Sequence, residues 1–167
     1  MRYAIIGNSG SGKTTLAKRL CEKYWLAHLD LDSIVWEPDQ IAVKRSRQAM
    51  EIDLAHFARE HADWVIEGCY GELVEAVLVH KPTLLFLNPG VEVCMENNRN
   101  RPWEPHKYES KQAQDSMLAN LQDWVRGYYE RDDDWSLRAH RRLFDRYPGP
   151  KREVVDASDY SDFQLTR

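Results

Sequence analysis

One short stretch, GNSGSGKT at residues 7–14, constrains this chain more than any other feature. It fits the pattern G-x-x-x-x-G-K-[ST] and lies between an apolar run at Tyr3–Ile6 and a segment with helical patterning. The glycines allow successive backbone N–H groups to point at one anion, and the start of the helix adds its positive end. Lys13 can reach the β- and γ-phosphates of a nucleotide, and the Thr14 hydroxyl is placed to coordinate Mg²⁺. The stretch therefore predicts a site for a purine nucleoside triphosphate.

A GTPase is not expected, because the chain contains no N-K-x-D pattern of the kind that reads guanine. The whole loop pattern arises by chance in roughly one chain in a hundred of this length. The strand before it and the helix after it are the context that the motif requires. The residues expected to bind the nucleotide are Gly7, Ser9, Gly10, Ser11, Gly12, Lys13, Thr14 and Thr15.

The composition is that of a soluble globular protein with one domain. Of the 167 residues, 43% are hydrophobic and 30% are charged, and the net charge is −4. This charge makes nucleic acid an unlikely main partner, and we interpret the basic stretch at 138–152 as a solvated helix face. The three cysteines form no C-x-x-C pair, which is typical of reduced thiols in a cytoplasmic protein. The apolar runs are too short for a signal peptide or a membrane span, so we expect no membrane partner.

Short apolar runs alternate with helical patterns, which predicts an α/β fold with a parallel sheet covered on both faces. The expected strands are Arg2–Ile6, Ala27–Leu29, Trp64–Glu67, Thr83–Leu87 and Glu153–Val155. The expected helices are Thr14–Lys23, Ser46–Ala62, Gly71–His80, Val91–Asn98, Lys111–Tyr129 and Ser136–Arg146. We predict two further segments to be irregular connections, namely Trp36–Lys44 and Arg99–Lys107.

Acidic residues follow two of the expected strands. Asp30 and Asp32 come after the second strand, and they share one side if that strand continues. Glu67 ends the third strand at the same edge of the sheet, where a parallel sheet opens toward its ligand. One carboxylate can hold Mg²⁺ through water, and another can accept the proton of an attacking hydroxyl. Alternatively, Asp32 caps the following turn and Glu67 pairs with a nearby basic side chain.

Three groups of residues together resemble a known family. They are the loop at 7–14, LDLD at 29–32 with Trp36 soon after, and WVIEGCY at 64–70. The chain is similar here to the small P-loop kinases, and within these to the adenylate-kinase-related proteins often labelled DNA topology modulation proteins. Shikimate and gluconate kinases look like more distant relatives. The resemblance covers roughly residues 1–101.

The resemblance implies a P-loop NTPase three-layer fold with a five-stranded parallel sheet of order 2-3-1-4-5 and helices on both faces. Members transfer the γ-phosphoryl group of ATP to a small acceptor, and a mobile lid supplies arginines. Arg99 and Arg101 lie where such a lid begins, and a planar guanidinium can clamp two oxygens of the transferring group. In this fold the region at 154–158 would lie near the adenine base.

The sequence also departs from the family pattern. Glu67 stands where the topology-modulation pattern has Asp, and Cys69 where it has Asn. The triple-glycine acceptor motif of shikimate kinases is absent, which makes shikimate an unlikely acceptor. Residues 102–150 match no motif of the family. We expect one P-loop kinase-like domain over 1–167, with an enlarged helical lid or insertion at 99–150.

The leading interpretation is an ATP-dependent phosphotransferase that uses ATP and Mg²⁺ and acts on a small hydroxyl- or phosphate-bearing acceptor. The alternative is a nucleotide-dependent regulatory or DNA-associated ATPase. The expected catalytic residues are Lys13, Asp30, Asp32, Arg99 and Arg101, and the expected metal-binding residues are Thr14, Asp32 and Glu67. The expected acceptor-binding residues are Asp32, Trp36, Lys44, Arg45, Glu67 and Tyr70. The division of roles among Asp30, Asp32 and Glu67 stays open at this point, as does the acceptor.

Overall fold

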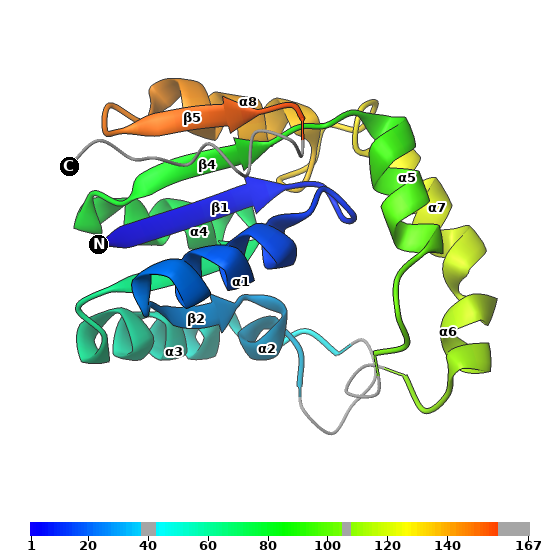
Figure 1. Cartoon of the computed structure of the whole chain (residues 1–167), viewed down its shortest axis with the longest axis horizontal. Coiled ribbons are helices and arrows are strands. Elements are labelled where there is room, and N and C mark those ends of the chain that lie inside the picture. Colours follow the sequence, from blue (N-terminus) through cyan, green and yellow to red (C-terminus); the bar gives the residue numbers. More distant parts are fainter. Residues whose placement is uncertain (38–42, 105–107, 157–167) are drawn as a thin grey trace.

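The computed structural model of the chain describes residues 1–37, 43–104 and 108–156, and its centre is a parallel sheet of five strands (Figure 1). The strands are β1 (Arg2–Gly7), β2 (Ala27–Asp30), β3 (Trp64–Gly68), β4 (Thr83–Leu87) and β5 (Lys151–Val154). Their order is β2-β3-β1-β4-β5, which confirms the predicted 2-3-1-4-5 arrangement. All five expected strands are present. The last begins and ends slightly before its predicted range, because Leu84 pairs with Lys151 and Leu87 with Val154.

Helices cover both faces of the sheet, as predicted. The helices are α1 (Lys13–Tyr24), α2 (Asp32–Val35), α3 (Arg47–Glu60), α4 (Gly71–Val77), a 3₁₀ turn η1 (Leu78–His80), α5 (Val91–Arg99), α6 (Lys111–Ser116), α7 (Leu118–Gly127) and α8 (Leu137–Arg146). Apolar residues of α2, α3, α4 and α8 form one core with one face of the sheet. Those of α1 form a second core on the opposite face. Among the described residues, no helix combines the length and apolar character that crossing a bilayer requires.

The central strand β1 is continuously apolar because both of its faces are buried. Tyr3 and Ile5 pack into the core beneath α1, whereas Ala4 and Ile6 pack into the core on the other face. All four side chains are at most 1% exposed. Hydrogen bonds to β3 on one side and β4 on the other complete the burial of the strand. The loop that follows therefore begins at the end of a buried strand that is paired on both sides.

The predicted helix Lys111–Tyr129 is two helices instead of one, which corrects that prediction. The hydroxyl of Ser116 donates to the carbonyl oxygen of Ala113 at 2.7 Å, and the N–H of Met117 donates to that of Gln114 at 3.2 Å. These bonds tighten the last turn of α6 and end it. Packing reinforces the division, since α7 contributes the buried Val125 to a core shared with α5, whereas α6 has no buried residue.

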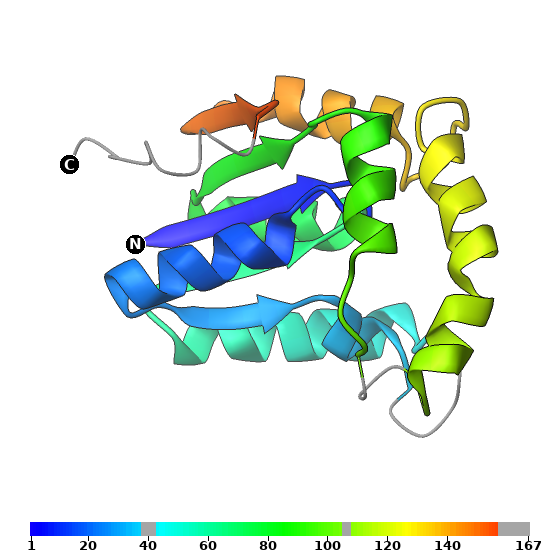
Figure 2. The same cartoon turned by 45° about the vertical axis from the view of Figure 1, so that its right-hand side comes forward.

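Helices α5, α6 and α7 lie beyond the carboxyl ends of the strands in both views (Figures 1 and 2). The loop that follows β1 lies at this same edge, between the sheet and α5. Helix α8 differs from the other helices of the predicted lid region, because its apolar residues Leu137, Leu143 and Phe144 pack against the core of the sheet. The region at 99–150 therefore includes both helices beyond the strand ends and a helix that belongs to the sheet layers.

A substitution at Gly68 tests how tightly Leu31 packs against β3. A Cβ at this position would lie 2.8 Å from the Cβ of Leu31, which is completely buried. We expect Gly68→Ala to lower the free energy of unfolding by about 1–3 kcal/mol, because the core beneath α2 must move to admit a methyl group. Urea denaturation followed by circular dichroism measures this change.

The control is Gly127→Ala, where a Cβ would meet only the end of the Arg131 side chain at 3.4 Å. This variant should stay within about 1 kcal/mol of the wild type, since alanine also favours the helix. Equal stability of Gly68→Ala and the wild type would contradict the tight packing of Leu31 on β3.

Candidate active site

The loop after β1 is shaped for an anion. Gly10 and Gly12 have φ angles of 76° and 94°, a region that residues with a side chain adopt at a cost. The N–H of Ser11 donates to the carbonyl oxygen of Asn8 at 3.2 Å, which closes the loop into a turn. Lys13 folds back over this turn, and its Nζ atom donates to the same carbonyl oxygen at 2.8 Å. The ammonium group is therefore held directly above the curled backbone.

The start of α1 completes this cradle. Helix α1 has no side-chain cap, and the bond from the N–H of Leu16 to the carbonyl oxygen of Gly12 opens its internal ladder. The N–H groups of the first turn thus lack acceptors within the helix and carry its positive end. Such amides, together with an ammonium group, fit the phosphate chain of a nucleotide. The residues predicted to bind ATP are brought together in this one loop and helix start.

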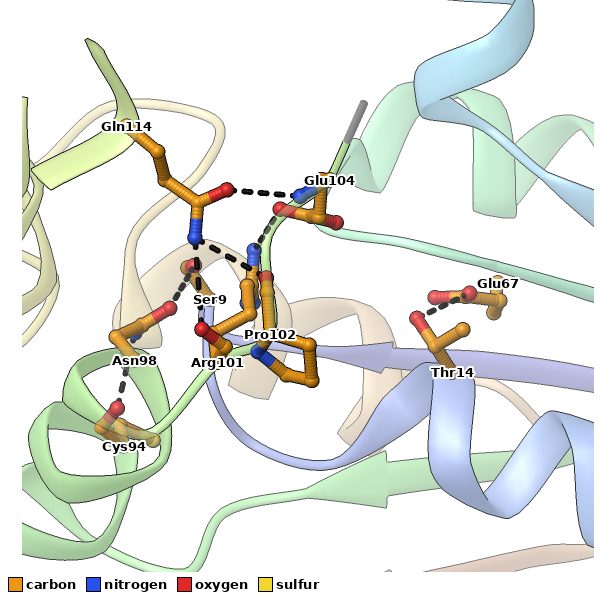
Figure 3. A network of polar contacts seen from close by, with 9 residues as sticks. All are labelled: Ser9, Thr14, Glu67, Cys94, Asn98, Arg101, Pro102, Glu104 and Gln114. Carbon is orange, nitrogen blue, oxygen red and sulfur yellow. Dashed lines mark hydrogen bonds and ion pairs between the residues drawn. The ribbon is translucent and has the colours of Figure 1, made fainter. Parts of the chain in front are cut away.

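Three asparagines tie the outer side of the loop to α5 and α7. Asn8 is 1% exposed, and its side-chain amide donates to the carbonyl oxygen of Val125 at 3.0 Å. Asn97 donates in the same way to the carbonyl oxygen of Gly10 at 2.8 Å. The hydroxyl of Ser9 donates to Asn98 at 3.2 Å, and Asn98 donates to the carbonyl oxygen of Cys94 at 2.9 Å (Figure 3).

Sequence reasoning missed these asparagines. They belong to no spacing pattern, and the only available signal was the pair of amide residues on a short amphipathic helix. Gly10 contributes to the same contact, because a Cβ there would overlap the carbonyl oxygen of Cys94. The glycine thus serves both the turn of the loop and the close approach of α5.

Glu67 and Thr14 meet beside the loop. The hydroxyl of Thr14 donates to Oε1 of Glu67 at 2.7 Å (Figure 3), and Glu67 is only 2% exposed. Nε2 of His28 lies 3.5 Å from the same oxygen. Asp30 is the register partner of Glu67 on the neighbouring strand. Within the described ranges, no group of three or more His, Cys, Asp or Glu side chains forms a metal site by itself. A cation here would take Thr14 and Glu67 together with phosphate oxygens.

The second strand does not continue through Asp32, so the condition under which Asp30 and Asp32 would share one side is not met. Strand β2 ends at Asp30, and α2 begins at Asp32. The carboxylate of Asp30 accepts a hydrogen bond from the N–H of Asp32 at 2.9 Å, and the hydroxyl of Ser33 donates to the carbonyl oxygen of Asp30 at 2.6 Å. Asp and Ser commonly turn the chain through such local bonds, so Asp30 and Ser33 together begin α2.

Asp32 is held by aromatic residues. The hydroxyl of Tyr70 donates to Oδ1 of Asp32 at 2.6 Å, and Nε1 of Trp36 donates to the Tyr70 oxygen at 3.1 Å. Burial, and then the neighbouring Asp32, raises the pKa of Tyr70, so its hydroxyl stays protonated and donates. The Tyr70 ring is 3% exposed and meets the edge of Trp135 at a centroid distance of 5.9 Å. Tyr70, which was predicted to bind the acceptor, is therefore buried and bonded to Asp32.

The two basic residues of the predicted acceptor site are both engaged. Nη1 of Arg45 lies 2.6 Å from Oδ2 of Asp53 and donates to the carbonyl oxygen of Ile34 at 3.0 Å. Nζ of Lys44 lies 3.6 Å from Glu72 and 4.9 Å from the ring centroid of Trp135. A β-bridge joins Trp36 to Lys44, and residues 38–42 of this predicted segment lie outside the described residues.

The two predicted lid arginines pair with acids of their own segment. Arg99 is the last residue of α5 and lies 2.7 Å from Glu96, and Arg101 lies 3.3 Å from Glu104. Gln114 of α6 accepts from the N–H of Glu104 at 2.9 Å and donates to the carbonyl oxygen of Pro102 at 3.1 Å (Figure 3). Residues 105–107 of the predicted segment Arg99–Lys107, and 157–158 of the predicted adenine region, lie outside the described residues.

A buried histidine joins the layers behind the site. Nε2 of His140 lies 2.9 Å from the carbonyl oxygen of Cys69 and Nδ1 lies 2.9 Å from the Tyr128 hydroxyl. The carbonyl can only accept, so Nε2 carries the proton and Nδ1 accepts from Tyr128. Burial lowers the pKa of His140 to about 4 and raises that of the Cys69 thiol to about 12, so both groups are neutral. All three cysteines are free thiols, consistent with the prediction.

A parallel sheet of order 2-3-1-4-5 with a glycine-rich loop after its central strand is the P-loop NTPase three-layer fold that the sequence predicted. No known protein-family model matches the chain. In sequence it is similar to a putative adenylate kinase of Halobacterium salinarum, with 27% identity over 96% of this chain and 99% of the relative.

Solved structures show the same fold. One is a shikimate kinase from Bacteroides thetaiotaomicron, with a TM-score of 0.58, 16% identity, and coverage of 97% of this chain and 92% of the other. Another is a gluconokinase from Sinorhizobium meliloti, with a TM-score of 0.51, 16% identity, and coverage of 96% and 85%. These comparisons confirm the fold and the resemblance to the small P-loop kinases.

His140 makes stability depend on pH. The folded protein keeps His140 neutral down to about pH 4, whereas the unfolded chain takes up the proton near pH 6.5. The contribution of neutral His140 to the free energy of unfolding is complete above pH 6.5. It is lost as the pH falls toward 4, by up to about 3 kcal/mol. We expect the free energy of unfolding to fall more steeply in the wild type than in His140→Gln between pH 6.5 and about 4.5.

Urea denaturation at several pH values measures these slopes. His56→Gln serves as the control, because His56 is 57% exposed and this variant should keep the slope of the wild type. Identical slopes in the wild type and His140→Gln would contradict a neutral, buried His140.

Proposed function

We propose that this protein is an ATP-dependent phosphotransferase that moves the γ-phosphoryl group to the hydroxyl group of a small acceptor. The proposal rests on one observation. A loop suited to bind an anion and several acidic residues lie together at one edge of the sheet. Lys13 and the uncapped start of α1 form the cradle, and Glu67 lies against Thr14 beside it. Asp32 begins α2 on the same edge, two residues after the end of β2.

The residues of the chain divide the work as follows. Lys13 exchanges the Asn8 carbonyl for phosphate oxygens when the nucleotide binds, and the loop amides orient the phosphate chain. Thr14 and Glu67 would hold the Mg²⁺ that accompanies ATP, which would supply positive charge beside the phosphates. Arg99 and Arg101 must leave Glu96 and Glu104 in order to contact the transferring group. The site thus provides a charge partner for each phosphate region.

We assign the proton transfer to Asp32. Its carboxylate is anchored through Tyr70 and Trp36, so its position is well defined. The acceptor O–H bond breaks, the proton passes to Asp32, the acceptor oxygen bonds to the γ-phosphorus, and ADP leaves with the bridging oxygen. Asp30 has a different task, because its carboxylate turns the chain into α2.

The similarity to a putative adenylate kinase supports a kinase that uses ATP. The alternative, a DNA-associated ATPase, depends on the basic stretch at 138–152. There His140 is buried and neutral, Arg141 forms a two-bond pair with Glu153, and Arg138 pairs with Asp132. These contacts leave the stretch less suited to a phosphate backbone, so we favour the phosphotransferase.

The decisive experiment measures ADP production from ATP and Mg²⁺ with nucleoside monophosphates, nucleosides, sugar acids and shikimate as acceptors. A true acceptor should raise turnover well above the background of hydrolysis by water. Lys13→Ala should lower the stimulated kcat/KM by at least about 100-fold, because it removes the charge over the phosphates. A Lys13→Ala variant that retains full turnover would contradict the proposal.

The anchoring of Asp32 can be tested separately. Asp32→Asn should lower kcat by at least about 100-fold, since an amide cannot accept the proton. Tyr70→Phe should lower kcat by about tenfold, because Asp32 loses a hydrogen bond that holds it. Steady-state kinetics should show little change in the KM for ATP in either variant.

Tyr147→Phe is the matched control. It also removes a buried hydroxyl, which donates to the carbonyl oxygen of Pro82 at 2.6 Å on the opposite edge of the sheet. Its kcat should equal that of the wild type. If Tyr70→Phe behaved like Tyr147→Phe, the proposed anchoring of Asp32 by Tyr70 would be wrong.

A further inference from the structure

The side chains around Asp32 indicate what kind of acceptor this site takes. We infer that the acceptor is an alcohol without a negative charge, neutral or cationic, and neither a nucleoside monophosphate nor a sugar acid. This inference rests on the proposed function and deepens it, because it names the substrate class of the same site.

The acceptor must lie on the β2 and β3 side of the phosphate loop. Lys13 and Thr14 mark the end of the phosphate chain, and Glu67 on β3 lies beside Thr14. Helix α2 follows β2 at this same edge of the sheet (Figure 1). We call the surroundings of Asp32 on this side the acceptor bed, with Trp36, Lys44, Glu72 and Trp135 as its other members.

Two basic residues of the described chain border the acceptor bed, and both are paired with acids. Nζ of Lys44 lies 3.6 Å from Glu72, whose side chain is 25% exposed. Arg45 lies 2.6 Å from Asp53 and also binds the carbonyl oxygen of Ile34. An anionic acceptor would therefore have to displace a carboxylate from each of these cations.

Arg131, which lies behind Trp135, is used in the same way. Its Nε atom lies 2.8 Å from Asp133. Its two terminal nitrogens donate to the carbonyl oxygens of Trp124 at 2.8 Å and Trp135 at 3.2 Å. Its guanidinium group also stacks on the ring of Trp124, 4.1 Å from the centroid. The three side-chain nitrogens of Arg131 are thus all engaged by α7 and the loop that follows it.

Among the described residues, further acids stand at this edge of the sheet. Asp30 ends β2, Asp32 begins α2 and Glu67 is the last residue but one of β3, in addition to the acids that pair with Lys44 and Arg45. An anionic acceptor would have to approach these carboxylates, and like charges brought close together oppose binding.

A phosphate-bearing acceptor needs the opposite environment. Phosphate monoesters are bound by guanidinium groups that offer two parallel donors, with few competing acids nearby. A hydroxyl group needs only an acceptor for its proton, which Asp32 supplies. Aromatic residues complete the bed, since Trp36 and Trp135 flank Tyr70. This combination suits an uncharged or cationic alcohol, although the relative at 27% identity carries the name of a kinase that acts on a nucleotide.

The first experiment compares two ligands by isothermal titration calorimetry with Mg²⁺ present. One is ATP, and the other is diadenosine pentaphosphate, which spans the ATP site and a nucleoside monophosphate site at once. We expect the two to bind within about tenfold of each other, because only one adenosine and its phosphates find a site. Binding of diadenosine pentaphosphate at least about 100-fold tighter than ATP would overturn the inference.

The second experiment uses acceptors that differ in charge. ADP release and mass spectrometry of the products are measured with adenosine against AMP, glucitol against gluconate, and methyl shikimate against shikimate. The uncharged member of a productive pair should have a kcat/KM at least about 100-fold higher. Faster turnover of the charged member would support the phosphotransferase and overturn the inference. If no acceptor stimulates turnover, the proposed function fails, and the binding comparison alone decides whether the bed takes a nucleoside monophosphate.

A charge variant tests the cause. Glu72→Gln frees Lys44, so it should reduce the preference for the uncharged acceptor, or raise the relative affinity for diadenosine pentaphosphate, by about tenfold. The control is Glu75→Gln, which removes the same charge from an exposed position on α4. Equal effects of the two variants, or none from Glu72→Gln, would contradict the role of the Lys44–Glu72 pair.

Discussion

The close contact between α5 and the phosphate loop is the constraint on which the rest of the site depends. The backbone at Gly10 lies directly against the Cys94 carbonyl, and buried amide groups of Asn8 and Asn98 satisfy the polar atoms of this contact. An unsatisfied polar group in such a position costs about 1–3 kcal/mol. The contacts with α5 and α7 therefore hold the loop in its curled shape.

The helices beyond the strand ends differ in stability. Helix α7 is tied to the loop through Val125 and to α8 through Tyr128 and His140. Helix α6 has no buried residue, and its Gln114 bonds to the backbone of Glu104 and Pro102. Elements with few buried contacts open at low free energy. We therefore expect α6 to open at a lower free energy than α7.

The sequence predicted much of the fold because its signals are local. The loop motif, the apolar strands and most helices depend on neighbouring residues, and all five strands are found in the predicted order. The break at Met117 and the start of α2 were missed, since side-chain bonds of Ser116 and Asp30 override the periodic pattern there. The partners of Asn98 and His140 are distant in the sequence, so no spacing could identify them. The roles of the predicted site residues stay predictions.

Charge pairing explains how one edge of the sheet can serve two different ligands. A phosphate chain requires positive groups, and these are concentrated in Lys13 and the start of α1. A proton acceptor requires an ionised carboxylate, which positive neighbours would make a weaker base. In this structure the cations of the acceptor bed are paired with acids, Lys44 with Glu72 and Arg45 with Asp53. The proposed acceptor, an alcohol without a negative charge, needs neither cation, and Asp32 supplies the proton acceptor that it does need.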